Sequence, residues 1–553
     1  MPGMDRREFL GTAAAGLALP AIRGRDNGTA RDGARVPAPD AQTGAAQRAQ
    51  AAAQPDPLFE RSVADLGADL RSGALTSRRL VQRYVTRIAA MDKSGPAVNA
   101  VIELNPDALA IADRMDAELK AGRPRGPLHG IPVLVKDNID SADRMRTTAG
   151  SLALAGSTPP RDAYIVERLR AAGAVLLGKT NLSEWANYRS TRSSSGWSGR
   201  GGQTRNPYVL DRNPCGSSSG TAAAIAADFA TVGIGTETDG SIICPSGICG
   251  LVGVKPTVGL WSRAGIIPIS ASQDTAGPMA RSVADAAALL GALAGVDPRD
   301  PATRDAAHGA QADYTKFLDA GGLKGARIGV ARNLAGFHPD VDRRFDDAIA
   351  AMRAAGAVIV DPANLTTAGR FGDAETTVLD YEFKAGVTAY LAALGAAAPA
   401  RTLADLIAFN AREAAREMPF FGQEIFVRAQ KAATLADRRY RDARALCVKL
   451  ARTEGIDATM TRHHLDAIVL PSNAPAWVTD HVNGDHVTGG DTSFAAVAGY
   501  PSVTVPMGLV SELPVGLSFV GRAWTEGPLL RLAYAFERAT RLRRPPRFLP
   551  SVA

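Results

Sequence analysis

The sequence CGSSSGTAAAIAADFATVGIGTETDGS, residues 215–241, predicts a helix, a strand and a turn in succession. Small apolar residues follow the serines without a break, which favours a buried helix, and VGIG is typical of a buried strand that leads into a glycine-bearing turn. Upstream, residues 161–185 predict a helix, a tight turn and a strand, and residues 130–140 predict a short buried strand that runs into a polar turn. Strands and helices that alternate in this way predict an α/β fold with a central sheet.

The rest of the chain extends this pattern. Residues 310–465 are rich in Ala and Arg and have a mostly helical pattern, after which LDAIVLPS, SVTVPMGLV and VGLSFVGR predict strands and GPLLRLAYAFERATRL predicts a closing helix. We find no internal repeat and no apolar segment long enough to span a bilayer. Hydrophobic residues make up 46% and charged residues 22% of the 553, which is ordinary for a globular protein with a large core. We expect one folded region over residues 57–553.

The N-terminal segment has the form of a twin-arginine export signal. Arg6 and Arg7 precede a short apolar run that ends near Ile22 and is too short to span a bilayer. Residues 1–22 are therefore predicted to be a signal peptide, and residues 23–56, rich in Ala, Gln, Pro and Gly, a disordered linker. We expect a periplasmic or secreted protein without a stable membrane anchor.

Composition and motifs argue against several classes of partner. The net charge of +7 comes from 63 basic and 56 acidic residues spread along the chain, with no basic tract interleaved with aromatics, so we expect no nucleic-acid partner. Residues 173–180, GAVLLGKT, match the P-loop pattern, but their four variable positions are Ala-Val-Leu-Leu, typical of a buried strand and not of a phosphate-binding loop. The seven histidines form no cluster with metal-ligand spacing, so we expect no metal.

Four cysteines are too few for a disulfide framework in a chain of this length. Cys244 and Cys249 could pair with each other in an oxidising compartment. The alternative, which we favour at this stage, is that they are small buried packing residues.

Two stretches suggest a serine nucleophile. CGSSSG fits G-x-S-x-G, the nucleophile elbow of serine hydrolases, with Ser218 at its centre. In TDGS, residues 238–241, the turn could direct several backbone N–H groups into one space beside Ser241, as stabilisation of an oxyanion requires, or it could be a plain strand-to-loop corner.

A lysine provides a candidate base. Lys136 ends the apolar run of IPVLVKDN, where desolvation would lower its pKa and leave a fraction of the amine neutral. A lysine paired with Asp137 or Asp140 is the structural alternative.

Taken together, the long motifs resemble the amidase signature family. GIPVLVKDN, CGSSSG and GTETDGSIICPSGICGLVGVKPTVG carry the resemblance, with Ser217 and Ser241 separated by 24 positions and SRAGIIPISASQDTAGPMARSVADAA following. The likeness runs from about residue 57 to residue 553 and is most specific to the bacterial peptide amidase subgroup. It implies a large mixed β-sheet covered by helices on both sides, with residues 310–465 as a variable helical part.

The resemblance also assigns roles. It implies Ser241 as nucleophile, Ser217 as a proton-relay serine that follows a cis peptide bond, and Lys136 as base. Backbone N–H groups of Thr238, Asp239 and Gly240, with that of Ser241, would form the oxyanion hole. No cofactor is implied. Ser218, Trp185 and Tyr188 are candidate substrate contacts, and Ser218 and Ser219 are also expected to shape the turn.

The implied activity is hydrolysis of carboxamides through an acyl-enzyme, with peptide C-terminal amides or small amides as substrates and ammonia as product. Asp239, in place of a glycine, and Ile243, in place of an arginine, depart from many family members. Three alternatives stay open: an A-type subunit of an amidotransferase, a non-catalytic relative, and an esterase-type hydrolase that uses Ser218.

Overall fold

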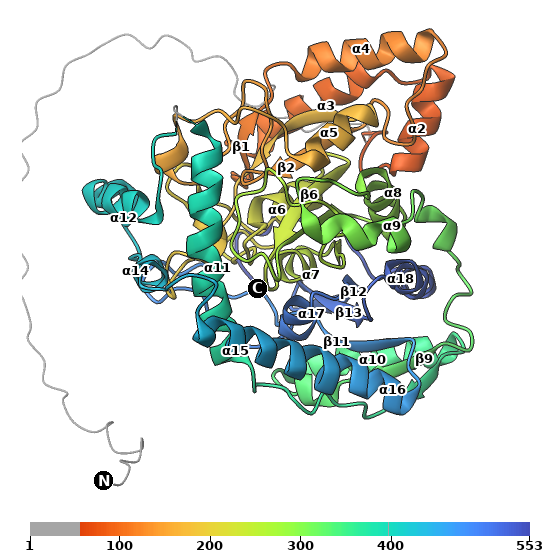
Figure 1. Ribbon diagram of the computed structural model, residues 1–553. Coiled ribbons are helices and arrows are strands. Elements are labelled where there is room, and N and C mark those ends of the chain that lie inside the picture. Colours follow the sequence, from red (N-terminus) through yellow and green to blue (C-terminus); the bar gives the residue numbers. More distant parts are fainter. Residues whose placement is uncertain (1–55, 396–397, 553) are drawn as a thin grey trace, which may run out of the picture. The chain divides into compact units, whose positions relative to one another are not determined.

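The structure is a computed structural model that describes residues 56–395 and 398–552. The chain divides into two units, Met1–Pro57 and Leu58–Ala553, and the fold described below is that of the second (Figure 1). The predicted signal peptide and nearly all of the predicted linker lie outside the described residues.

An 11-stranded sheet forms the centre of the molecule, in the order β1-β3-β2-β6-β8-β7-β12-β13-β11-β9-β10. The strands are β1 Val101–Leu104, β2 Pro132–Lys136, β3 Val175–Thr180, β6 Val232–Glu237, β7 Val252–Lys255, β8 Thr275–Ala280, β9 Arg327–Val330, β10 Val358–Val360, β11 Ala467–Pro471, β12 Ser502–Val510 and β13 Leu513–Val520. β2 pairs in parallel with β3 and β6, whereas β6–β8 and β12–β13 are antiparallel, so the sheet is mixed. A separate pair, β4 Trp197–Ser198 and β5 Gly202–Gln203, forms a two-stranded ribbon.

Helices cover both faces of this sheet. As a result, every residue of β2, β3, β6, β8 and β13 is buried. The helices are α2 Val63–Ser72, α3 Ser77–Met91, α4 Ala108–Lys120, α5 Tyr164–Ala171, α6 Ser219–Ala226, α7 Ile243–Ile248, α8 Val283–Leu293, α9 Ala306–Gly309, α10 Pro339–Ala354, α11 Gly372–Ala393, α12 Leu403–Arg412, α13 Ala414–Glu417, α14 Glu424–Gln430, α15 Arg438–Cys447, α16 Ala458–His463, α17 Ser493–Ala498 and α18 Glu526–Thr540. In Figure 1, α2–α5 surround the β1–β2 end of the sheet, and α10 and α16 lie beside β9. The predicted α/β fold is confirmed.

Most elements predicted around the motifs are present. The helix and strand expected within residues 161–185 are α5 and β3, so the P-loop look-alike is a buried strand. In the described part of residues 310–465, helices dominate as expected, but β9 and β10 also form there and extend the sheet beyond β11. These two strands leave no clear pattern in the sequence, because each is only three or four residues long within Ala-rich helical surroundings.

Local sequence explains where several helices begin. The side chains of Ser62, Thr76 and Ser282 each accept a hydrogen bond from a backbone N–H in the first turn of α2, α3 and α8. Thr402 and Asp405 form a complete capping box at α12. No helix of residues 56–395 and 398–552 is long and apolar enough to cross a membrane.

Helix α6 lies unusually close to β6. All eight of its residues are buried, and five of them are Ala or Gly. A Cβ atom added to Gly233 of β6 would lie 2.7 Å from Thr221 Cγ2 and 2.9 Å from Ile225 Cγ1. Small residues on the helix and glycine on the strand therefore set the distance between the two elements, and with it the place of the serines that precede α6.

We predict that Gly233→Ala lowers the free energy of unfolding by about 1–3 kcal/mol, because the new methyl group overpacks the contact between α6 and β6. Chemical denaturation measures the effect. Gly156→Ala is the matched control, since a Cβ at this exposed position would meet nothing within 4 Å. Equal stability of the two variants would show that the close contact does not constrain the fold.

Candidate active site

Lys136 is buried at the end of β2 and is fully enclosed, with 0% of its surface exposed. Its Nζ lies 2.7 Å from Ser217 Oγ, 2.8 Å from Thr236 Oγ1 and 3.2 Å from Thr236 O. The carboxylates considered as alternative partners bond elsewhere: Asp137 accepts from the Thr148 hydroxyl, and Asp140 accepts from Tyr390 Oη at 2.8 Å. The lysine is therefore placed against hydroxyl groups and not against an acid.

Burial lowers the pKa of Lys136 to about 7, although Glu237 and Asp274 act in the opposite direction. A neutral amine has one lone pair, which can accept the proton of the Ser217 hydroxyl while an N–H of the amine donates to Thr236 Oγ1. The site therefore holds a nitrogen base that is substantially unprotonated near neutral pH.

Ser217 precedes α6 in a loop where the Gly216–Ser217 peptide bond is cis, as the resemblance implied. Its side chain is completely buried and contacts Lys136 Nζ. The neighbouring Ser218 is also buried; its Oγ donates to Thr236 O at 3.0 Å and accepts from Thr236 N at 3.2 Å. Ser218 thus fastens the serine loop to β6.

Ser241 follows the turn at the end of β6 and precedes α7. It is 7% exposed, and its carbonyl accepts a hydrogen bond from Ser218 N at 3.2 Å. Among the residues that the structure describes, no hydrogen bond joins the hydroxyls of Ser217 and Ser241. Such contacts are often long in enzymes without a bound substrate.

The turn between β6 and Ser241 is held by its side chains. Thr238 Oγ1 donates to Asp274 Oδ1 at 2.6 Å, and the Asp239 carboxylate accepts from Thr492 Oγ1 at 2.5 Å and Ser493 Oγ at 2.6 Å. Gly240 has φ +77°, a conformation that favours glycine.

The backbone N–H groups of this turn are free. Within the described part of the chain, the N–H groups of Thr238, Asp239, Gly240 and Ser241 donate to no other residue. Gly240 and Ser241 are buried and Thr238 and Asp239 are half-buried, and N–H groups in such places are seldom left without an acceptor, so this turn is suited to a negatively charged oxygen.

A cavity of about 360 Å³ opens beside this turn. Asn138, residues 236–238, apolar residues 266–269 and Ala385 and Gly386 of α11 line it, and so do the ionisable side chains of Arg263, Asp274, Arg299, Asp300 and Glu382. Within that cavity wall, the Oδ1 atom of Asn138 has no hydrogen-bond partner. The cavity reaches the turn through residues 236–238, whereas Lys136, Ser217 and Ser241 are not among the described residues that line it.

Two of the predicted substrate contacts lie elsewhere. Trp185 packs edge-on against Phe426, and Tyr188 donates to Asp380 Oδ1 at 2.7 Å. Both belong to the hydrophobic cluster with α11, α12 and α14, and neither lines the cavity, although Ala186 between them does.

The sequence analysis missed Thr236 and Asn138. Thr236 contacts Lys136 through both its hydroxyl and its carbonyl, and Asn138 Nδ2 donates to Thr236 Oγ1 at 3.0 Å. A signal existed: Asn138 lies two positions after Lys136, and Thr236 two positions before Thr238. Each therefore lies two positions from a residue that the motifs had singled out, although residues 137–138 form a turn after β2, where strand alternation does not apply.

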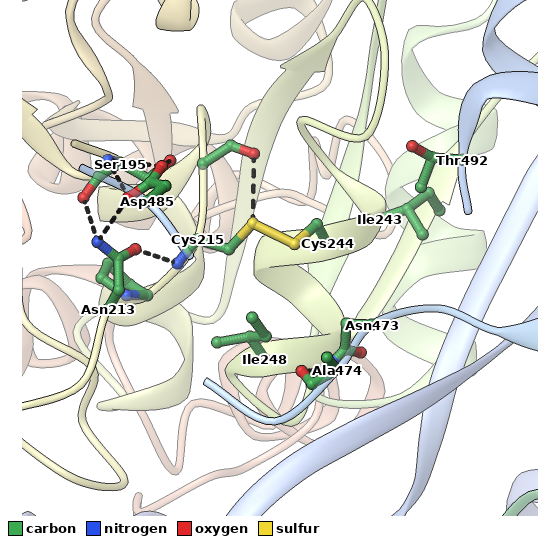
Figure 2. Close-up of a disulfide and its surroundings, with 12 residues drawn as sticks. Ser195, Asn213, Cys215, Ile243, Cys244, Ile248, Asn473, Ala474, Asp485 and Thr492 are labelled. Carbon is green, nitrogen blue, oxygen red and sulfur yellow. Dashed lines mark hydrogen bonds between the residues drawn. A yellow bond between two sulfur atoms is a disulfide. The ribbon is translucent and has the colours of Figure 1, made fainter. Parts of the chain in front are cut away.

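The suggested Cys244–Cys249 disulfide is wrong, and so is the favoured alternative that Cys244 is an unpaired packing residue. Cys244 is bonded to Cys215, and the two Cα atoms are 6.2 Å apart (Figure 2). Cys249 is a buried free thiol at the end of α7, and Cys447 is a second one. The fold joins the serine loop to the first turn of α7, a proximity between distant segments that sequence spacing did not reveal.

Comparison with known proteins adds to this geometry. Residues 79–530 match the protein-family model described as Amidase. A probable amidase of Arabidopsis thaliana is 41% identical over 504 residues, which cover 89% of this chain and 92% of that protein. The A-type subunit of the glutamyl-tRNA(Gln) amidotransferase of Carboxydothermus hydrogenoformans is 33% identical over 504 residues, 87% of this chain and 98% of its own.

Solved structures of peptide amidases are also similar to this chain. The native peptide amidase from Stenotrophomonas maltophilia is 56% identical, with a TM-score of 0.86, and covers 89% of this chain and 99% of its own. A peptide amidase in complex with the competitive inhibitor chymostatin is also 56% identical, with a TM-score of 0.87, and covers 89% of this chain and 100% of its own.

Proposed function

The chain belongs to the amidase signature family and is an amide-hydrolysing enzyme, and from this premise we propose that it removes the terminal amide of C-amidated peptides through Ser241, Ser217 and Lys136. One observation carries the assignment of residues. A buried lysine with a lowered pKa bonds to Ser217, in a loop that bonds to Ser241 beside four free backbone N–H groups.

In the proposed mechanism, Lys136 Nζ accepts the proton of Ser217 while Ser217 accepts the proton of Ser241. Ser241 Oγ attacks the amide carbonyl, and the N–H groups of residues 238–241 stabilise the oxyanion of the tetrahedral intermediate. Ser217 then donates a proton to the departing nitrogen, and ammonia leaves. Water, which gives up a proton through Ser217 to Lys136, attacks the acyl-enzyme, and Ser241 regains its proton as the carboxylic acid is released.

The proposed substrate class rests on likeness and on the cavity. Two of the solved structures are peptide amidases that are 56% identical to this chain. Residues 266–269, with Ala385 and Gly386 of α11, form an apolar part of the wall, which suits the side chain of an apolar residue that carries the amide, although Glu382 of α11 also lines the cavity. Small aliphatic amides would fill less of this wall and gain less from it.

Two alternatives are less well supported. An A-type subunit of an amidotransferase would need a partner, whereas the proposed reaction needs only water. An esterase-type hydrolase based on Ser218 would need a free hydroxyl, but Ser218 Oγ already bonds to the Thr236 backbone in both directions.

We also propose export through the twin-arginine pathway. Arg6 and Arg7 before a short apolar run support this, and so does the Cys215–Cys244 disulfide, because disulfides persist in oxidising compartments.

We predict that the purified enzyme releases ammonia from a C-amidated dipeptide faster than from a simple aliphatic amide. Ser241→Ala and Lys136→Met should each lower kcat by at least about 10⁴-fold, because the nucleophile or the base is lost. Ser218→Ala should lower it by about tenfold or less. The reverse pattern, a dead Ser218→Ala and an active Lys136→Met, would establish the esterase-type alternative, and ammonia release that requires a partner protein would favour the amidotransferase.

We predict that kcat/KM rises with pH through a midpoint of about 7, since only the neutral form of Lys136 accepts a proton and burial lowers the pKa of its amine to that value. Below the midpoint the rate should fall about tenfold for each pH unit. Circular dichroism over the same range controls for unfolding. A flat profile from pH 5 to 9 would contradict the assignment of Lys136 as base.

We predict that the full chain, produced in a bacterium with a twin-arginine pathway, reaches the periplasm and is shortened at its N-terminus. Arg6→Lys with Arg7→Lys should retain it in the cytoplasm, while Arg23→Lys with Arg25→Lys, outside the motif, should not. Cell fractionation and mass spectrometry make the comparison. Periplasmic accumulation of the first variant would refute export by this route.

A further inference from the structure

The Cys215–Cys244 disulfide lies directly beside the two serines. Cys215 is two residues before Ser217, and Cys244 is three residues after Ser241. Along the chain the serines are 24 positions apart, but the disulfide joins Cys215 to Cys244 and so links the two short segments that carry them.

Each end of the disulfide is fixed to a different part of the fold. Cys215 N donates to Asn213 Oδ1 at 2.8 Å, and Asn213 Nδ2 donates to Ser195 O at 3.0 Å and to Asp485 Oδ1 at 3.3 Å, as Figure 2 shows. Cys244 N donates to Gly240 O at 2.9 Å, in the first turn of α7. Movement of one part against the other would change the distance between the serines.

Hydrogen bonds also tie the serine loop to the end of β6, where Ser218 Oγ donates to Thr236 O at 3.0 Å and accepts from Thr236 N at 3.2 Å. Between residues 215–218 and residues 238–244, the direct bonds in the described structure are the disulfide and the hydrogen bond from Ser218 N to Ser241 O at 3.2 Å. Along the chain, Ser217 lies between Cys215, which forms the disulfide, and Ser218, which forms the hydrogen bond.

The backbone of Cys215 gives a second reason to assign a role to this side chain. Its φ is +57°, in the left-handed region that a residue with a Cβ adopts at a cost and that glycine adopts freely. A cysteine at such a position indicates that its sulfur contributes something that a glycine would not.

We propose that the Cys215–Cys244 disulfide is a positioning element that holds Ser217 and Ser241 at the separation required for proton transfer. This inference rests on the proposed function of the two serines. Neither cysteine contacts the reacting atoms; both act through the serine segments. Full activity therefore requires the oxidised protein.

The test compares Cys215→Ala/Cys244→Ala with Cys249→Ala/Cys447→Ala, which removes the two buried free thiols and keeps the disulfide. The first variant should lose about 10- to 100-fold in kcat, because small misplacement of reacting groups is costly, with KM changed less than about threefold. The pH midpoint should stay in place, since burial is the main cause of the lowered pKa of Lys136 and the variant leaves that residue buried. The control should keep kcat within about twofold of the parent, because its catalytic groups are untouched.

A second measurement uses the parent protein, so it does not depend on folding of a variant, and its labelling readout does not require a known substrate. A dithiol converts the disulfide of the parent protein into two thiols and itself becomes a cyclic disulfide; it should lower kcat and the rate at which a fluorophosphonate labels Ser241 by the same factor, reversibly on reoxidation. Labelling is located by mass spectrometry. The Cys249→Ala/Cys447→Ala protein should respond in the same way as the parent.

The outcomes are distinct. If the oxidised parent hydrolyses no amide but its Ser241 is labelled in a disulfide-dependent way, the proposed function fails and the positioning role stands. Unchanged kcat and labelling after removal or reduction of the disulfide, or an equal loss in the control variant, would overturn the inference. A lower melting temperature with unchanged kcat would also overturn it, since it would show a purely structural disulfide.

Discussion

An amine buried in a sheet without an acidic partner is the constraint on which the rest of this structure depends. Transfer of a charged ammonium out of water is costly, and Lys136 Nζ meets only hydroxyl and carbonyl oxygens. The parallel pairing of β2 with β6 sets Val135 opposite Ile234, so the ends of the two strands lie side by side and Lys136 at the end of β2 contacts Thr236. A register shift of one residue would turn the lysine to the other face of the sheet.

The second constraint is the short distance between α6 and β6. Glycines in β6 and small residues in α6 allow helix and strand to approach, and the loop before α6 thereby brings Ser217 to the lysine and Ser218 to the Thr236 backbone. A Cβ on Gly235 would lie 2.8 Å from Ser218 Oγ. The absence of side chains at these glycines, which take no part in the proposed reaction, therefore sets the geometry of the site.

The motifs carried most of what could be predicted from sequence. Apolar periodicity predicted β2, β3, α5, α6 and β6, because these elements bury whole faces and leave a clear pattern. It missed β9 and β10, whose few residues give too short a pattern. The contact of Thr236 with Lys136 and the bond between Cys215 and Cys244 join segments that are distant in sequence, and their proximity depends on strand order, which the pattern of single elements does not specify.

Strand order also governs when the fold can be completed. β12 and β13, residues 502–520, lie between β7 and β11 in the interior of the sheet, so the two halves of the sheet are separated by strands that are synthesised last. On the ribosome, the first half exposes the edge of β7 and the second half that of β11 until these strands emerge, and exposed strand edges invite association with other chains. The centre of the sheet is therefore completed last. A chain that ends early lacks interior strands of the sheet and not merely an edge strand.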